Sequence, residues 1–263
     1  WIVLGSLQFE PSELMKVALI VLLAKYFSQR HVQSYQIRHV LASGLYAAVP
    51  MGIILIQPDL GSAMILGILW AVILLAVGVD RKHLTALVLL GLVGMGAAWT
   101  WGLAPYQKDR ILAFIDPYQD PTGYGYHIIQ SKVAIGSGGL LGKGIGQGSQ
   151  ATLGFLPEPY NDFAFASLAE QLGFAGILVL LSLVVLVVWR IMRAGLNARN
   201  NFAELYCLGV ATLIASHAII SAGVNTGLLP ITGIPFTFLS YGGSHLMSVA
   251  LSLSIVQSIN RYG

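Results

Sequence analysis

Charged residues are scarce in this chain, and several classes of protein are excluded by what it lacks. Only 10 % of the 263 residues are Asp, Glu, Lys or Arg, whereas a typical soluble domain has about 25 %. Cysteine occurs once, at Cys207, so no internal disulfide can form and a disulfide-stapled secreted scaffold is excluded. The thirty glycines follow no three-residue period, which excludes collagen. The composition also excludes a disordered chain and a nucleic-acid-binding domain, so we expect no nucleic-acid partner.

Apolar residues make up 56 % of the sequence and the mean hydropathy is +0.76, an excess too large for one soluble core. A helix needs about 20 mainly apolar residues to cross a bilayer. Seven such stretches predict an all-α fold, a polytopic transmembrane helical bundle that forms a single integral membrane domain over residues 1–263. The predicted spans are residues 12–28, 38–56, 61–79, 84–102, 164–189, 203–228 and 243–260.

The basic residues predict which ends of the spans face the cytoplasm, because short cytoplasmic loops are enriched in Lys and Arg. Nine of the fourteen basic residues fall on one side, which we therefore expect to be cytoplasmic. Residues 103–163 then form a large extracytoplasmic loop that we expect to fold against the bundle. The chain starts at Trp1 in apolar sequence without a basic signal region, so we expect an amino-terminally truncated protein. The nine residues are Lys25, Arg30, Arg38, Arg81, Lys82, Arg190, Arg193, Arg199 and Arg261.

Three acidic residues near the outer ends of predicted spans have both a functional and a structural interpretation. Glu13 and Lys16 share one helix face and either form an ion pair that faces a substrate cavity or extend to the outer headgroups. Asp59, between Pro58 and Gly61, either caps the next helix or has a catalytic or metal-binding role. Asp162 either caps the following span or acts as a general base on a sugar hydroxyl.

Two irregular segments are rich in glycine. Residues 136–148 resemble a phosphate cradle, but Gly144 follows Lys143 where a Walker motif needs Ser or Thr. The backbone there either holds a diphosphate with help from Lys132 or Lys143, or forms a tightly packed loop that needs glycine. Residues 233–244 are punctuated by Gly and Pro and are a candidate cavity wall.

No group of His, Cys or carboxylate residues has the spacing of a dedicated metal site. The residues alone therefore leave two classes of function open. One is an enzyme that acts on a lipid-linked substrate, and the other is a transporter of a polar or lipid-linked solute.

Nine short motifs, in order along essentially the whole chain, resemble those of the SEDS family (shape, elongation, division and sporulation). The similarity is greater to the elongation branch of that family, with the division branch as the alternative. The motifs are FEPSELMK (9–16), QPDLG (57–61), Arg110 with the downstream DP (116–117), QSKVAIGSGG (130–139), LGFLPE (153–158), DFAFA (162–166), AE (169–170), GIP (233–235) and LSYGGS (239–244).

The resemblance implies a ten-helix fold in which the seven spans correspond to helices four to ten. It implies a peptidoglycan glycosyltransferase that polymerises lipid II together with a class B penicillin-binding protein, the transpeptidase. In this comparison Asp162 matches the catalytic aspartate, and Glu13 and Lys16 match a polar pair lining the central cavity. The predicted substrate-binding residues are Glu13, Lys16, Arg110, Lys132, Asp59 and Ser240.

Some residues depart from the family pattern. Glu10 stands where Gln is usual, Tyr160 and Asn161 stand where His and Thr usually precede the aspartate, and His245 replaces a usual Ser. Gln171 and the pair Phe236 and Thr237 are further departures. None of them removes the predicted catalytic acid, although Tyr160 and Asn161 change its hydrogen-bonding surroundings.

We therefore predict an inverting glycosyl transfer during cell-wall elongation, with Asp162 as general base. Arg110, Lys132 or a divalent cation (Mg²⁺ or Mn²⁺) would stabilise the leaving diphosphate, although no cofactor is certain. The predicted location is the bacterial inner membrane, with the active site on the extracytoplasmic side. The alternative function is a lipid II flippase, a transporter.

Overall fold

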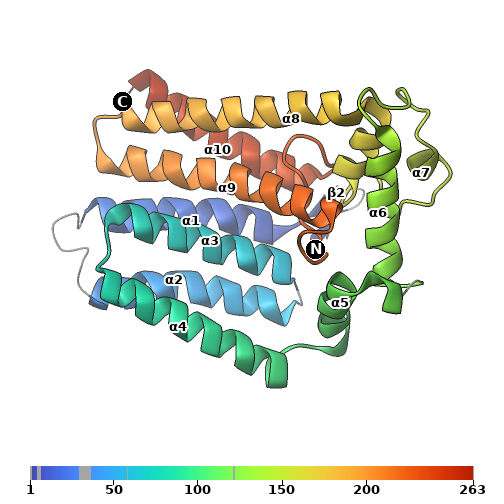
Figure 1. Ribbon diagram of the computed structural model, residues 1–263. Helices are drawn as coiled ribbons and strands as arrows, with labels where there is room; N and C mark the ends of the chain where they lie inside the picture. Colours follow the sequence, from blue (N-terminus) through green and yellow to red (C-terminus); the bar gives the residue numbers. More distant parts are fainter. Residues whose placement is uncertain (1, 5–6, 30–36, 58, 121, 263) are drawn as a thin grey trace. The chain divides into compact units, whose positions relative to one another are not determined.

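The computed structural model describes residues 2–4, 7–29, 37–57, 59–120 and 122–262 (Figure 1). Three residues used in the sequence predictions, Trp1, Arg30 and Pro58, lie outside the described part of the chain. The first described residues form a short antiparallel hairpin of β1 (Ile2–Leu4) and β2 (Leu7–Phe9), in which Ile2 is paired with Phe9. This hairpin is a small addition to the predicted all-α architecture.

A helix covers each of the seven predicted spans, usually to within three residues at each end. The fold class predicted from the sequence is thus confirmed. These helices are α1 (Pro11–Ser28), α2 (Ile37–Ile56), α3 (Leu60–Val77), α4 (Arg81–Ala97) with a π-helical turn, η1 (Ala98–Gly102), α8 (Ala164–Leu196), α9 (Asn201–Thr226) and α10 (Gly243–Tyr262).

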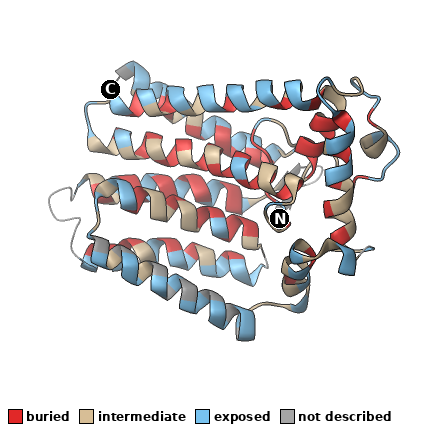
Figure 2. Ribbon diagram, viewed as in Figure 1, coloured by how far each residue is buried: buried red, intermediate tan, exposed pale blue. Residues whose placement is uncertain are grey.

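Four of these helices, α2, α3, α8 and α9, are long and apolar enough to cross a membrane by length and composition alone. The helix α1 is long enough but carries Glu13, Lys16 and Lys25, and charges inside a span are costly unless they are paired. Figure 2 shows exposed residues along α8 after its mostly buried first turns, and these exposed residues are largely apolar, as expected for a lipid-facing helix.

Packing divides the chain into two compact units, each built from segments far apart in the sequence. The first unit comprises Trp1–Leu89, Val185–Ser216 and Gly242–Gly263. The second comprises Leu90–Val184 and His217–Tyr241, so the division passes through α4, α8 and α9. That the whole chain is one membrane domain stays a prediction.

The core of the first unit is formed by apolar faces of α1, α2 and α3. Its polar side chains are satisfied within the core: the Trp70 indole donates to Ser43 Oγ at 3.1 Å, and the Tyr26 hydroxyl lies 2.9 Å from His39 Nδ1. Such pairing is expected, because an unsatisfied polar group costs several kcal/mol in a membrane. The buried apolar residues include Leu19, Leu23, Phe27, Val40, Ala47, Ile54, Ala63, Leu66, Ile73 and Leu74.

The predicted large loop is largely helical and forms much of the second unit. It contains α5 (Pro105–Ile115), the 3₁₀ turn η2 (Pro117–Gln119), α6 (Tyr124–Gly138) and the short α7 (Ser149–Thr152). Within this unit α6 packs against α8 and α9. Ser131 Oγ of α6 donates to the Asn225 carbonyl of α9 at 2.7 Å. A Cβ on Gly138 would lie 2.0 Å from the Ala169 carbonyl of α8, so only glycine fits there.

The sequence did not predict a break in α8. At Gly173 the backbone has φ 67° and ψ −165°, which interrupts the helix and frees backbone groups. The glycine-rich loop satisfies them: the N–H groups of Phe174 and Ala175 donate to Gly139 and Leu140 at 2.9 and 3.0 Å. In return, the N–H groups of Lys143 and Gly144 donate to the carbonyls of residues 170 and 171, both at 3.0 Å.

Candidate active site

Asp162 lies at the end of a tight turn that leads directly into α8. The Glu158 carbonyl closes this turn by accepting the N–H groups of Asn161 at 3.1 Å and Phe163 at 3.3 Å. Glu158 has a φ of 44°, which is unusual for a residue other than glycine and indicates a turn held by its surroundings. The helix begins two residues after Asp162, at Ala164.

Residues from the far end of the sequence fix the backbone around Asp162. The Asn225 side-chain amide, which is fully buried, donates from Nδ2 to the Asp162 carbonyl and accepts from the Ala166 N–H, both at 2.9 Å. The Ser240 hydroxyl donates to the Asn161 carbonyl at 2.7 Å. Hydrogen bonds from α9 and from the loop before α10 therefore fix the backbone at residues 161, 162 and 166.

The Asp162 carboxylate has no hydrogen-bond donor within the described part of the chain. The cap that we weighed for this residue is thus absent, and the helix start is held through backbone carbonyls instead. The side chain is half-buried, and burial raises the pKa of its carboxyl, to which the negative charge of Glu158 adds. The positive charge of Arg110 acts in the opposite direction and lowers this pKa.

Arg110 lies in an aromatic setting near Asp162. Its guanidinium carbon is 5.6 Å from the centre of the Tyr106 ring and 5.0 Å from that of Tyr124, both within cation–π range. No described carboxylate forms an ion pair with Arg110. Its Nε is buried and has no hydrogen-bond partner among the described residues. The nearby His127 has a pKa lowered by burial and by Arg110, and its ring stacks on Phe163 with centroids 6.2 Å apart.

An acidic cavity of about 700 Å³ adjoins this cluster. Tyr124 and His127 line it together with three acids, Asp109 of α5 and the two residues that flank η2, Asp116 and Asp120. His127 connects this cavity to the turn, because its ring stacks on Phe163, the residue that follows Asp162.

Lys132 and Ser240 occupy different places relative to Asp162. Lys132 is exposed on α6, and its aliphatic stem covers Gly227, where a Cβ would lie 2.2 Å from Lys132 Cε. Ser240 lies beside Asp162, but its hydroxyl also accepts the Phe236 N–H at 2.9 Å. With both bonds made inside the protein, Ser240 is placed to support the turn.

In the first unit, Glu13 and Lys16 form the predicted ion pair. Lys16 Nζ lies 2.7 Å from Glu13 Oε1, and the two side chains are 1 % and 5 % exposed for Lys16 and Glu13. Sequence reasoning missed the third member, His245 of α10, whose Nδ1 lies 2.9 Å from Glu13 Oε2. Such burial argues against an interfacial pair that extends to the headgroups.

Asp59 also lies in the first unit and caps α3. Its Oδ1 accepts the Ser62 N–H at 2.9 Å, as expected for an Asp at this position. The structure therefore brings Glu13 and Lys16 together, and it places Arg110, Ser240 and the Asp162 turn in one neighbourhood.

The glycine-rich loop does not offer a diphosphate cradle. The amide groups of residues 142–144 and 146–147 donate to protein acceptors. The Lys143 ammonium forms an ion pair at 2.7 Å with Glu170, which also accepts the Ser149 hydroxyl and two N–H groups of α7. Of the two alternatives, the structure favours a packed loop that needs glycine.

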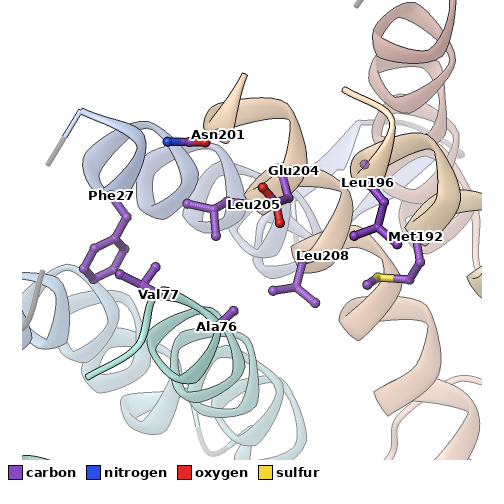
Figure 3. Close-up of a pocket in the computed structure, with 10 residues that line it drawn as sticks. Phe27, Ala76, Val77, Met192, Leu196, Asn201, Glu204, Leu205 and Leu208 are labelled. Carbon is purple, nitrogen blue, oxygen red and sulfur yellow. The ribbon is translucent and has the colours of Figure 1, made fainter. Parts of the chain in front are cut away.

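A smaller, mostly apolar cavity of about 220 Å³ lies in the first unit among the ends of α1, α3, α8 and α9 (Figure 3). Glu204 is the single acid among the residues that line it, and Phe27, Val77, Met192 and Leu208 are among the apolar ones. A lone carboxylate beside apolar side chains offers no acid and base pair, so this cavity is a weaker candidate.

The chain resembles known proteins along its whole length. Stage V sporulation protein E of Bacillus subtilis is 39 % identical over 265 residues, which cover 100 % of this chain and 71 % of that protein. Peptidoglycan glycosyltransferase MrdB of Escherichia coli K12 is 35 % identical, covering 100 % of this chain and 70 % of the relative. A probable peptidoglycan glycosyltransferase FtsW of a Geobacter species is 37 % identical over 99 % of this chain and 70 % of its own length.

Solved structures show the same similarity. A chain of a peptidoglycan synthase complex, described as coordinating polymerization and crosslinking, matches with a TM-score of 0.80 and 33 % identity over 99 % of this chain and 72 % of that one. The rod-shape-determining protein RodA of Thermus thermophilus matches with a TM-score of 0.68 and 27 % identity, over 100 % and 70 % of the two chains. The family described as cell cycle protein, which comprises FtsW, RodA and SpoVE, matches residues 1–263. The chain therefore belongs to this family, the SEDS family that its motifs indicated.

Proposed function

We propose that the chain is a peptidoglycan glycosyltransferase that polymerises lipid II into glycan strands. The observation that carries this proposal is the state of Asp162: its backbone is fixed by Asn225 and Ser240, while its carboxylate is half-buried and accepts no hydrogen bond from the described residues. A base must be held in position and still be able to receive a proton. Relatives with 35 % and 37 % identity carry the name peptidoglycan glycosyltransferase.

In the proposed reaction, Asp162 accepts the proton of the 4-hydroxyl of the acceptor sugar. The oxygen attacks the anomeric carbon of the donor with inversion, and the bond to undecaprenyl diphosphate breaks as the diphosphate takes the bonding electrons. A raised pKa makes the carboxylate a stronger base, provided that it is still ionised at the working pH. Burial and Glu158 both contribute to that basicity.

Arg110 is the group that we propose for the leaving diphosphate. A guanidinium matches the geometry of phosphate oxygens, and this one is held between two tyrosine rings without an ion pair to a described carboxylate. Lys132 is exposed, so we propose its ammonium as a second cation for the diphosphate of the lipid-linked substrate. Glu13, Lys16 and Asp59 remain predicted substrate-binding residues.

A divalent cation remains an alternative for the same task, and we assign no step to it. Among the described carboxylates, Glu158 is the one whose charge raises the pKa of Asp162, and it already accepts a hydrogen bond from the Asn161 side chain at 2.9 Å. Two carboxylates, one of them already engaged, do not make a dedicated metal cage.

The proposed setting is the bacterial inner membrane, with Asp162 on the extracytoplasmic side, as the positive charges of the sequence predict. The proposed partner is a class B penicillin-binding protein, the transpeptidase that crosslinks the new strands. A structural neighbour belongs to a complex described as coordinating polymerization and crosslinking, which supports this partner.

The test is polymerisation of purified lipid II by the full-length protein with its partner, followed by analysis of glycan length. Asp162→Asn is expected to lower the rate by about 10²–10⁴-fold, the usual contribution of a general base. Asp80→Asn is the matched control, because it removes the same charge from an exposed position just before α4, outside the candidate site and its cavity, and we expect normal polymer. If the wild-type protein moved lipid II across vesicles without forming glycosidic bonds, the flippase alternative would replace this proposal.

A further inference from the structure

The C-terminal ends of α8 and α10 lie in the first unit (Figure 1). Their side chains line a polar groove. It is open along the helices and has a volume of about 770 Å³. The polar residues that line it come from the ends of both helices, and none of them is acidic. They are Arg190 and Arg193 of α8, Asn197 directly after its end, and Ser254, Gln257 and Asn260 of α10.

The spacing explains why these residues face one another. Arg190, Arg193 and Asn197 are three and four residues apart, which places them on one face at the end of α8. Gln257 and Asn260 are likewise three residues apart on α10. Two polar stripes therefore line the groove opposite each other, with guanidinium donors on the α8 wall and amide donors on the α10 wall.

The two arginines are held close together and have no acidic partner. The guanidinium carbons of Arg190 and Arg193 lie 5.8 and 5.4 Å from the centre of the same ring, that of Trp189. No ion pair joins either arginine to a carboxylate in the described ranges of the chain. The groove thus concentrates two positive charges that nothing in its walls neutralises.

The position of the groove along the helices is that of a membrane headgroup layer. Trp is enriched at the boundary between membrane and water, and Trp189 is 52 % exposed. Towards the middle of the helices the polar stripes give way to exposed apolar side chains, Val185 and Leu186 on α8 and Leu251 on α10. A cationic groove that continues into an apolar surface matches a phosphate headgroup with acyl chains below it.

We propose that this groove binds the phosphodiester headgroup of an anionic phospholipid. The guanidinium groups of Arg190 and Arg193 donate to the phosphate oxygens, and the amides of Asn197 and Gln257 donate to the remaining headgroup oxygens. The acyl chains lie along the exposed apolar faces of α8 and α10. The site is at the helix ends that the positive charges predict to be cytoplasmic, and it does not depend on the proposed glycosyl transfer.

The test is lipid titration of the full-length protein in detergent micelles, followed by native mass spectrometry. Phosphatidylglycerol and phosphatidylcholine with the same acyl chains are the two probes. We expect phosphatidylglycerol to bind at least tenfold more tightly, with a preference that weakens as salt is added. Equal binding of the two lipids by the wild-type protein would by itself overturn the proposal.

The double variant Arg190→Gln, Arg193→Gln is expected to bind phosphatidylglycerol about 30-fold more weakly, because each basic residue near an anionic membrane surface contributes roughly a factor of five. The matched control is Lys82→Gln, Arg199→Gln, which removes two exposed positive charges of the same predicted side from outside the groove. We expect less than a threefold change in the control.

Two further results would contradict the assignment. An equal loss of binding in both double variants would show that the lipid responds to net charge and not to this groove. Tight binding of glycerophosphoglycerol, the headgroup without acyl chains, at the affinity of the intact lipid would show a soluble phosphate site in place of a lipid site. Because both arginines are exposed, the variants should unfold at the temperature of the wild-type protein.

Discussion

Replacing Lys16 by methionine tests the most deeply buried Lys–Glu ion pair among the described residues. The substitution removes an ammonium 2.7 Å from Glu13 Oε1, where the two side chains are 1 % and 5 % exposed. Removing one partner of a buried ion pair typically costs about 3–5 kcal/mol, because a charge is left buried without compensation. Methionine has a similar length and adapts to its surroundings, so the loss reports the charge and not a cavity.

The third member of the cluster sets where the loss should fall in that range. His245 Nδ1 lies 2.9 Å from the other oxygen of Glu13, so the carboxylate keeps this polar neighbour when the ammonium is removed. We therefore expect Lys16→Met to cost about 3 kcal/mol, at the lower end. For a chain of this size, such a loss corresponds to a fall in Tm of roughly 6–12 °C.

Thermal unfolding in detergent micelles measures this loss, with Lys82→Met as the control because Lys82 is exposed. The double variant Glu13→Gln, Lys16→Met should recover at least about 1 kcal/mol, since the carboxylate no longer needs a cation. If Lys16→Met were as stable as Lys82→Met, or if the two losses were additive, the pair would not be coupled. Glycan synthesis should stay low in the double variant, because the proposed contacts to the substrate are removed.

Three other substitutions test separate parts of the structure. Glu158→Gln removes a charge that raises the pKa of Asp162; because the base works when deprotonated, the acidic limb of the pH–rate profile should move to lower pH, and an unchanged limb would refute the coupling. Asp59→Ala should lower the free energy of unfolding by about 1 kcal/mol, because the helix cap is lost. Asp59→Asn still caps α3 and should keep both stability and activity. A loss of activity in the stable Asp59→Asn variant would indicate that Asp59 contacts substrate. Gly138→Ala should prevent normal folding, because its Cβ would lie 2.0 Å from a carbonyl oxygen, while Gly136→Ala meets open space and should be tolerated in a thermal unfolding assay.

The helical segments could be predicted from the sequence because each is set by a local property, an apolar run of about 20 residues. The break in α8 at Gly173 could not be predicted in this way, since the apolar pattern continues through it. The break depends on hydrogen bonds to residues 139–144, which lie about thirty residues earlier. Hydropathy identifies how long a span is, whereas its interruptions depend on which segment packs beside it.

The candidate site shows the same division between local and distant information. Asp162 stands at the start of a span, and Asp59 caps a helix within three residues, so both could be located from local sequence. His245 lies 232 residues from Glu13, and no local pattern connects the two. The glycine-rich loop left two alternatives open, because its sequence does not show whether its amide groups bind a ligand or the protein.

The distribution of hydrogen bonds around Asp162 gives a physical reason to regard it as a base and not as a structural acid. Donors aimed at a carboxylate stabilise its charged form and lower its pKa, as in the caps of helices. Here the side chains of Asn225 and Ser240 donate to the main-chain carbonyls of residues 162 and 161, and no described donor reaches the carboxylate. The turn is therefore fixed without weakening the basicity of the side chain that it carries. A structural aspartate would show the opposite arrangement, with its carboxylate engaged, as it is in the cap that Asp59 forms on α3.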